Sequence, residues 1–126
     1  MSAVKLLVLA GSPREGSFNQ RLADTAAAMA QAQGAEVTSI QIDSFGLPMY
    51  TPHLEATAFP EGARRLKSLF VQHHGALMAA PEYNGSIPAY LKNAIDWVSR
   101  PTDGEGPLAL SAFRGKVAGL MSASPG

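Results

Sequence analysis

The apolar positions of this chain fall into short continuous runs, which alternate with stretches of helical periodicity. Continuous apolar runs are typical of strands that are buried on both faces of a parallel sheet. Three such runs predict interior strands at residues 4–10, 76–80 and 116–124. Residues 36–42 alternate only in part, with Ile40 and Ile42 on one face, and predict a strand nearer the sheet edge.

Three segments between these runs repeat apolar side chains at helical spacing and predict helices. They cover residues 17–33, a segment that Pro60 can start and Gly75 follows, and residues 88–99. The expected buried stripes are Leu22, Ala26, Met29 and Ala30 in the first, Leu66, Leu69 and Phe70 in the second, and Leu91, Ala94, Ile95 and Val98 in the third. Residues 43–62 and 101–113 are rich in glycine and proline and are expected to be loops.

The alternation of strands and helices predicts an α/β fold, an open parallel sheet with helices on both faces. Neither a repeat nor a linker divides residues 1–126, so we expect a single domain. Three helices cover such a sheet incompletely, and the closing "SASPG" looks like another strand-to-helix turn. We therefore expect the domain to be truncated here, without its C-terminal helix and last strand.

Composition and charge narrow the class of protein. Ten basic residues balance ten acidic ones without a block of like charge, which argues against a nucleic-acid or membrane surface. The chain has no cysteine, so disulfides and thiol chemistry are excluded. No apolar run approaches the roughly 20 residues that span a bilayer. A cytoplasmic protein is the default expectation.

The loop "GSPREGSFN" follows the first strand and opens the first helix, at the sheet edge where open α/β folds bind ligands. Helix N-terminal amides attract anions, and the side chains of Ser12, Arg14, Ser17 and Asn19 offer further donors. Gly11 and Gly16 allow a close backbone approach. The alternative is a plain helix cap, since Ser17 and Gln20 match the S-x-x-Q capping box and Arg14 can be solvated.

The type of phosphate ligand is narrowed by two motifs that the sequence lacks. The P-loop pattern G-x-x-x-x-G-K-[ST] does not occur, and neither does the dinucleotide pattern G-x-G-x-x-G. A phosphate monoester is therefore a better candidate ligand than the nucleotides that these two motifs bind. A second polar loop, within "PEYNGSIPAYLKNAIDW" (81–97), follows the third predicted strand and should lie at the same edge of the sheet.

These two loops together resemble the NADPH-dependent FMN reductases. "GSPREGSFN" is similar to their phosphate loop G-S-x-R-x-x-S-x-N, and "PEYNGSIPAYLKNAIDW" is similar to their flavin-ring segment. The family includes quinone, chromate and azo-dye reductases on a flavodoxin-like fold. The resemblance implies that Ser12, Arg14, Ser17 and Asn19 bind the FMN phosphate, with Gly11 also in the cofactor site. It places Pro81, Glu82, Tyr83, Asn84, Gly85 and Ser86 along the flavin ring, with Ser122 and Ser124 in the next cofactor loop. A tight turn at Asn84–Gly85 can present its amides to the polar edge of that ring.

Several of these residues keep a second interpretation. Ser86 can cap the third helix, Tyr83 can pack at the rim, and Glu82 can be a solvated or subunit-contact carboxylate. Trp97 and Tyr90 are expected to be packing or interface residues. Met49 and Tyr50 belong either to a substrate rim or to a cover over the sheet edge. The three histidines are not spaced as metal ligands, so no metal site is expected.

The resemblance implies an FMN-dependent oxidoreductase with NADPH or NADH as electron donor. Hydride would pass to flavin N5, and a quinone, flavin, azo compound or metal oxyanion would then take the electrons in a ping-pong cycle. No catalytic side chain is needed, because the flavin carries the chemistry. The family also implies a homodimer or homotetramer. Two alternatives stay open: a flavodoxin-type electron carrier and a non-catalytic interaction protein.

Overall fold

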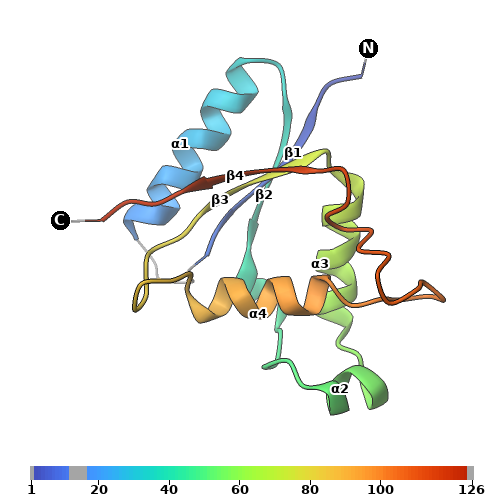
Figure 1. Ribbon diagram of the computed structural model, residues 1–126. Coiled ribbons are helices and arrows are strands. Elements are labelled where there is room, and N and C mark those ends of the chain that lie inside the picture. The colour runs from blue at the N-terminus through green and yellow to red at the C-terminus, as the bar shows by residue number, and fades with distance from the viewer. Residues whose placement is uncertain (1, 12–16, 125–126) are drawn as a thin grey trace.

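The computed structural model of the chain describes residues 2–11 and 17–124, and strands alternate with helices along it (Figure 1). The strands are β1 (Lys5–Ala10), β2 (Glu36–Gln41), β3 (Gly75–Ala79) and β4 (Val117–Met121). The α-helices are α1 (Phe18–Ala32), α2 (Pro52–Thr57), α3 (Glu61–Gln72) and α4 (Ala89–Val98). A short 3-10 helix, η1 (Ile42–Phe45), follows β2.

The four strands form one parallel sheet in the order β2-β1-β3-β4. This order places β1 and β3 in the interior and β2 at an edge, as the apolar pattern predicts. The chain moves from β1 to one side for β2 and to the other side for β3, so a topological switch point lies between β1 and β3. The same order opens the flavodoxin-like sheet, which confirms the expected fold class.

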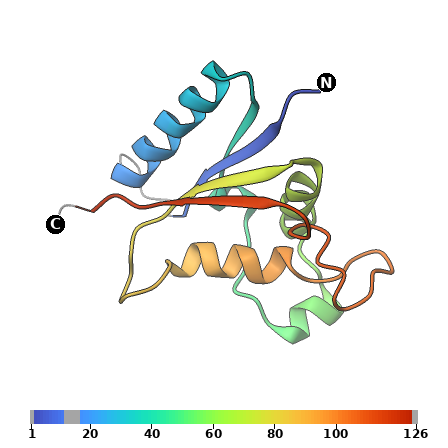
Figure 2. The same ribbon diagram turned by 45° about the horizontal axis from the view of Figure 1, so that its top comes forward.

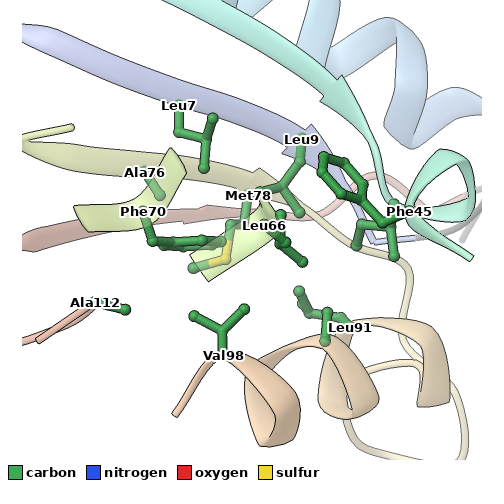
Figure 3. Close-up of a cluster of buried hydrophobic side chains, with 12 residues drawn as sticks. Leu7, Leu9, Phe45, Leu66, Phe70, Ala76, Met78, Leu91, Val98 and Ala112 are labelled. Carbon is green, nitrogen blue, oxygen red and sulfur yellow. The ribbon is translucent and has the colours of Figure 1, made fainter. Parts of the chain in front are cut away.

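Helices cover both faces of the sheet (Figures 1 and 2). Alternate side chains of β1 divide between the two layers, because Leu7 and Leu9 join one buried cluster and Val8 and Ala10 the other. Figure 3 shows the larger cluster, in which side chains of β1 and β3 meet those of α3 and α4. The smaller cluster packs Ala23 and Ala27 of α1 on the opposite face.

The predicted buried stripe of α1 was wrong in part. The buried residues of α1 are Asn19, Ala23 and Ala27, whereas Met29 is 61% exposed. The helix packs on the sheet through its small alanine side chains, and Met29 lies outside that face. Strand β4 was expected in the sheet interior, but within the described residues it lies at the edge. At that edge Val117 and Leu120 are exposed over more than 70% of their surface.

The segment expected to be one loop, residues 43–62, contains a further helix. Helix α2 begins at Pro52, and the Thr51 hydroxyl caps it by accepting a hydrogen bond from the Leu54 amide at 3.1 Å. Threonine before a proline in the first turn is a start signal that the sequence contains. The proline and glycine content of the surrounding loop obscured it. The predicted loop 101–113 is confirmed as a series of turns.

Candidate functional site

The loops after β1, β3 and β4 lie side by side along the edge formed by the carboxyl ends of the strands, because parallel strands run in the same direction. Two backbone hydrogen bonds fix their neighbourhood. The Gly11 amide donates to the Ala79 carbonyl at 2.7 Å, and the Ala80 amide donates to the Met121 carbonyl at 2.9 Å. The resemblance placed its site residues on these three loops, so the fold brings the described ones to a common edge.

Gly11 is needed here for close packing. A Cβ atom at this position would lie 3.0 Å from the Ala80 Cβ and 3.3 Å from the Leu91 Cβ. Glycine therefore lets the end of β1 contact both the end of β3 and the start of α4. The next predicted phosphate ligands, Ser12 and Arg14, lie outside the described residues.

Ser17 is the N-cap of α1, so the capping interpretation is confirmed for this residue. Its hydroxyl accepts a hydrogen bond from the Gln20 amide at 3.0 Å. The Gln20 side chain does not complete the capping box, because it bonds Asp24 and Gln41 instead. A cap at the start of a helix leaves other amides of the first turn available, so Ser17 as a phosphate ligand stays a prediction.

Asn19 follows in the first turn of α1, and its side chain is directed at the segment after β4. The Ala123 amide donates to Asn19 Oδ1 at 2.9 Å, and Asn19 Nδ2 donates to the Ala123 carbonyl at 3.2 Å. The residue is only 4% exposed. The predicted contact of Asn19 with phosphate stays a prediction, and the described partner of its amide is the backbone of Ala123.

The loop after β3 folds into a two-residue hairpin. Tyr83 and Ser86 form an antiparallel bridge, with amide-to-carbonyl hydrogen bonds of 2.9 and 3.1 Å. Asn84 and Gly85 between them have φ of 52° and 78°, the pair of positive angles of a type I′ turn. The tight Asn-Gly turn expected from the sequence is thus present. Ser86 as cap of α4 was wrong, since Pro88 holds the N-cap position and Ser86 is paired within the hairpin.

Glu82 contacts this turn, since its carboxylate accepts a hydrogen bond from the Gly85 amide. The sequence suggested that the Asn84 and Gly85 amides could face the polar edge of a flavin. In this conformation the Gly85 amide is already engaged by Glu82. A ligand would reach that amide only after the carboxylate turns away.

A hollow of about 370 Å³ opens between the hairpin and the end of β4. It is lined by the predicted site residues Pro81, Glu82, Gly85, Ser86 and Ser122, and by Met78, Ala80, Ile87, Leu91, Leu120 and Met121. The apolar members were missed by the sequence reasoning. The signal that could have found them is their position, at or just after the end of β3 or β4 and at or just before the first turn of α4. Of the predicted ring residues, Tyr83 and Asn84 do not line this hollow.

The hollow fits the flavin that the resemblance implies. Its volume falls in the range of small-molecule sites, and its walls combine apolar side chains with a few polar groups. Flat aromatic ligands need such apolar walls, while the carboxylate and serine side chains at the hairpin and at Ser122 can bond a polar rim. The apolar and polar groups that line this hollow therefore suit the ring of FMN.

A second hollow, of about 380 Å³, lies beside α4 at the end of β2. Met49 and Tyr90 line it together with Asp43 and Asn93. The segment before Met49 is fixed to α4, because Asn93 Nδ2 and Trp97 Nε1 both donate to the Pro48 carbonyl, at 3.0 and 2.7 Å. Trp97 is fully buried, so its role as a packing residue is confirmed.

Tyr50 belongs to the packing of this loop. Its hydroxyl donates to Glu55 at 2.5 Å, and Arg100 Nε donates to the other carboxylate oxygen at 2.9 Å. The hydrogen bond from Tyr50, supported by Arg100, lowers the pKa of Glu55. The same bond raises the pKa of Tyr50. Both shifts mean that the hydrogen bond favours an ionised Glu55 carboxylate beside a neutral Tyr50 phenol. Tyr50 therefore makes a structural contact within this loop.

The described part of the chain contains neither a metal-ligand cluster nor a membrane-spanning helix. Within it, no three histidine, aspartate or glutamate side chains lie together as metal ligands would. No helix there has the length and apolar content that a membrane crossing needs.

Comparisons with known proteins agree with the two-loop resemblance. The model of the family described as NADPH-dependent FMN reductase matches residues 4–126. A 2-hydroxy-1,4-benzoquinone reductase from Burkholderia sp. is 37% identical over 124 residues, which are 98% of this chain and 62% of the relative. An NAD(P)H-dependent FMN reductase from Pseudomonas aeruginosa is 36% identical over 126 residues, covering 98% of this chain and 61% of the relative.

A solved structure gives the same picture. The flavoenzyme NAD(P)H:(acceptor) oxidoreductase from Paracoccus denitrificans is similar with a TM-score of 0.79 and 32% identity, over 98% of this chain and 63% of that one. The chain thus spans about three fifths of the length of these relatives.

Proposed function

Because the chain belongs to the NADPH-dependent FMN reductase family, we propose that it contributes the flavin site of an FMN-dependent NAD(P)H oxidoreductase. The observation that carries the proposal is the hollow between the hairpin and the end of β4, at the same edge as the loop after β1. Bound FMN would supply the redox chemistry, since flavins take up hydride and pass electrons to an acceptor. Residues 1–126 would form one FMN-binding domain.

The chain's own residues bind and orient in this proposal. Ser12, Arg14 and Ser17 would hold the phosphate, as the resemblance implies, next to the N-terminal amides of α1. The apolar walls at Leu91 and Met121 would exclude water from the ring. Donors at the Asn84–Gly85 turn would stabilise negative charge on a reduced ring once Glu82 leaves the Gly85 amide.

The electron acceptor is proposed to be a small molecule. The name of the Burkholderia relative refers to a benzoquinone, which supports a quinone acceptor ahead of a flavin, an azo compound or a metal oxyanion. We further infer a cytoplasmic homodimer or homotetramer from the family resemblance. Exposed apolar side chains at Met49, Tyr83 and Tyr90 support a subunit contact. Sedimentation analysis of the purified protein tests the assembly.

Anaerobic reduction tests the activity. Purified protein loaded with FMN should lose its flavin absorbance on addition of NADPH, and benzoquinone should restore it. Continuous NADPH oxidation with benzoquinone separates a reductase from an electron carrier, which would not turn over alone. A protein that binds no FMN, or whose bound FMN is not reduced by NADPH or NADH, contradicts the proposal.

A pair of arginine variants makes the test specific to the phosphate loop. Arg14→Ala should weaken FMN binding by roughly 1.5–3 kcal/mol, the scale of a hydrogen bond to a charged group. Arg21→Ala removes an exposed arginine of α1 and is the matched control, with FMN affinity expected to be unchanged. Equal FMN affinity in both variants would indicate that Arg14 is a solvated loop residue and not a phosphate ligand.

A further inference from the structure

The side chain of Asn19 forms a reciprocal pair with the backbone of Ala123, over 104 residues of sequence. One primary amide accepts from the Ala123 N–H and donates to the Ala123 C=O, so it pairs with this residue as a neighbouring strand would. Figures 1 and 2 both show the segment after β4 passing the start of α1. Both polar groups of Ala123 are thereby satisfied two residues beyond the end of β4.

The position of this pair joins two predicted parts of the site. Asn19 lies in the first turn of α1 and is the last residue of the motif that resembles a phosphate loop. Ala123 follows Ser122, which lines the hollow opposite the hairpin. Helix α1 itself is packed on the sheet through Ala23 and Ala27. The wall that carries Ser122 is therefore fixed to the same helix terminus that would face the phosphate.

We propose that Asn19 is a positioning residue, which fixes the Ser122–Ser124 segment against α1 and so couples the phosphate end of the flavin site to its ring end. The inference rests on the proposed FMN binding. It assigns Asn19 a different role from the phosphate contact that the resemblance implies, because its oxygen and its amide nitrogen both bond Ala123 and the side chain is almost fully buried. If the Asn19 side chain left Ala123, its buried amide would lack hydrogen-bond partners, which costs free energy. The pair should therefore persist in solution.

Binding of two flavins to the variant Asn19→Leu tests the proposal. Leucine is close in size but can form neither hydrogen bond. FMN and riboflavin share the ring, and only FMN carries phosphate. If Asn19 positions the ring wall, the variant should weaken both flavins by the same factor, about fivefold or more, the effect of about one net hydrogen bond. Weakened binding of FMN alone would make Asn19 a phosphate ligand and overturn the proposal.

Asn93→Leu is the matched control. Asn93 makes the equivalent pair of bonds elsewhere, since its Oδ1 accepts from the Tyr50 amide at 2.8 Å and its Nδ2 donates to the Pro48 carbonyl. This variant should leave both flavin affinities within about twofold, because the loop it releases does not line the hollow of the hairpin. Equal losses in the two variants would indicate general loosening and overturn the proposal.

Amide hydrogen exchange gives a readout that needs no flavin. In the free wild-type protein the Ala123 amide should be protected although it lies beyond β4, and Asn19→Leu or the smaller Asn19→Ala should abolish this protection. An unprotected Ala123 amide in the wild type refutes the pair without any variant. Wild-type protein that binds neither flavin refutes the proposed function. Wild-type protein that binds FMN, with an Asn19→Leu variant that binds it equally well, refutes only this inference.

Discussion

At the scale of single residues, several positions are decided by what lies within a few ångströms. Gly62 in the first turn of α3 is such a position, because a Cβ atom there would lie 1.7 Å from the Phe45 carbonyl oxygen. The contact is with backbone, which cannot turn away as a side chain could. Glycine is therefore what allows η1 to pack against α3.

Gly62→Ala should destabilise the protein by about 1–3 kcal/mol, the usual cost of overpacking. This loss would appear although alanine alone favours a helix by up to about 1 kcal/mol over glycine. Urea denaturation measures the change. Gly106→Ala is the control, since a Cβ at Gly106 meets nothing within 4 Å, and its stability should change by less than about 0.5 kcal/mol. Equal stability of the two variants would contradict the packing argument.

At the scale of elements, the turns of residues 101–113 are fixed to α3 by one lysine. Lys67 is buried, and its ammonium donates to the Arg100 carbonyl at 2.9 Å, to the Thr102 hydroxyl at 2.8 Å and to the Glu105 carboxylate. The hydrogen bond from Lys67 is the main cause that lowers the pKa of Glu105 from 4.5 to about 2, with further bonds from Ser111 and Thr102. A loop without helix or strand is thereby held in one place.

This pair should make stability depend on pH. The carboxyl of Glu105 has a lower pKa in the folded chain than in the unfolded chain, so its contribution is fully present above about pH 4.5. That contribution should be lost progressively as the pH falls from 4.5 toward 2. Urea titrations of wild type and Glu105→Gln should therefore differ at pH 6 and converge toward pH 2.

Asp103→Asn is the control for this loop. It removes the ion pair of Asp103 with Arg64, at 3.1 Å, in which the Asp103 side chain is 83% exposed and the Arg64 side chain 41% exposed. Exposed pairs contribute little to stability, so this variant should remain close to wild type at pH 6. A wild type that keeps its full advantage over Glu105→Gln at pH 2 would contradict the assignment of the Glu105 pKa.

At the scale of the whole molecule, the candidate site is assembled from three loops that lie far apart in the sequence; Asn19 beside the first and Ala123 in the last are 104 residues apart. FMN that contacts the loops after β1, β3 and β4 would bind only the folded chain, and it should therefore stabilise the entire domain by mass action. The stabilisation is expected to reach about 2.7 kcal/mol when free FMN is about 100 times its Kd. Thermal unfolding at increasing FMN concentration measures it.

Adenosine monophosphate provides the control for this effect. It has a phosphate monoester but no flavin ring, so it can use only the phosphate end of the proposed site. Its stabilisation should be smaller than that of FMN at equal concentration. An unfolding temperature that does not respond to FMN, or responds equally to both compounds, would contradict a site that spans the three loops.

A structural feature could be predicted from the sequence where it depends on residues that are close together along the chain. Apolar runs and helical stripes predicted β1, β3, α3 and α4, because burial of an apolar face is written into the spacing of the residues. The Asn84–Gly85 turn and the Ser17 cap were also predictable, since each depends on the conformation of two to four consecutive residues. The exposure of Met29 was not predictable, because neighbours in space decide it.

The sequence by itself determined the α/β class, the order of strands and helices, and the two loops that resemble a phosphate site and a flavin-ring site. Only the tertiary structure decided that the segment after β4 contacts α1 through Asn19, and that Glu82 engages the Gly85 amide. It also decided which apolar side chains wall the hollow beside the hairpin. The physical reason is that these contacts join residues brought together by parallel pairing and helix packing, which spacing along one chain does not specify.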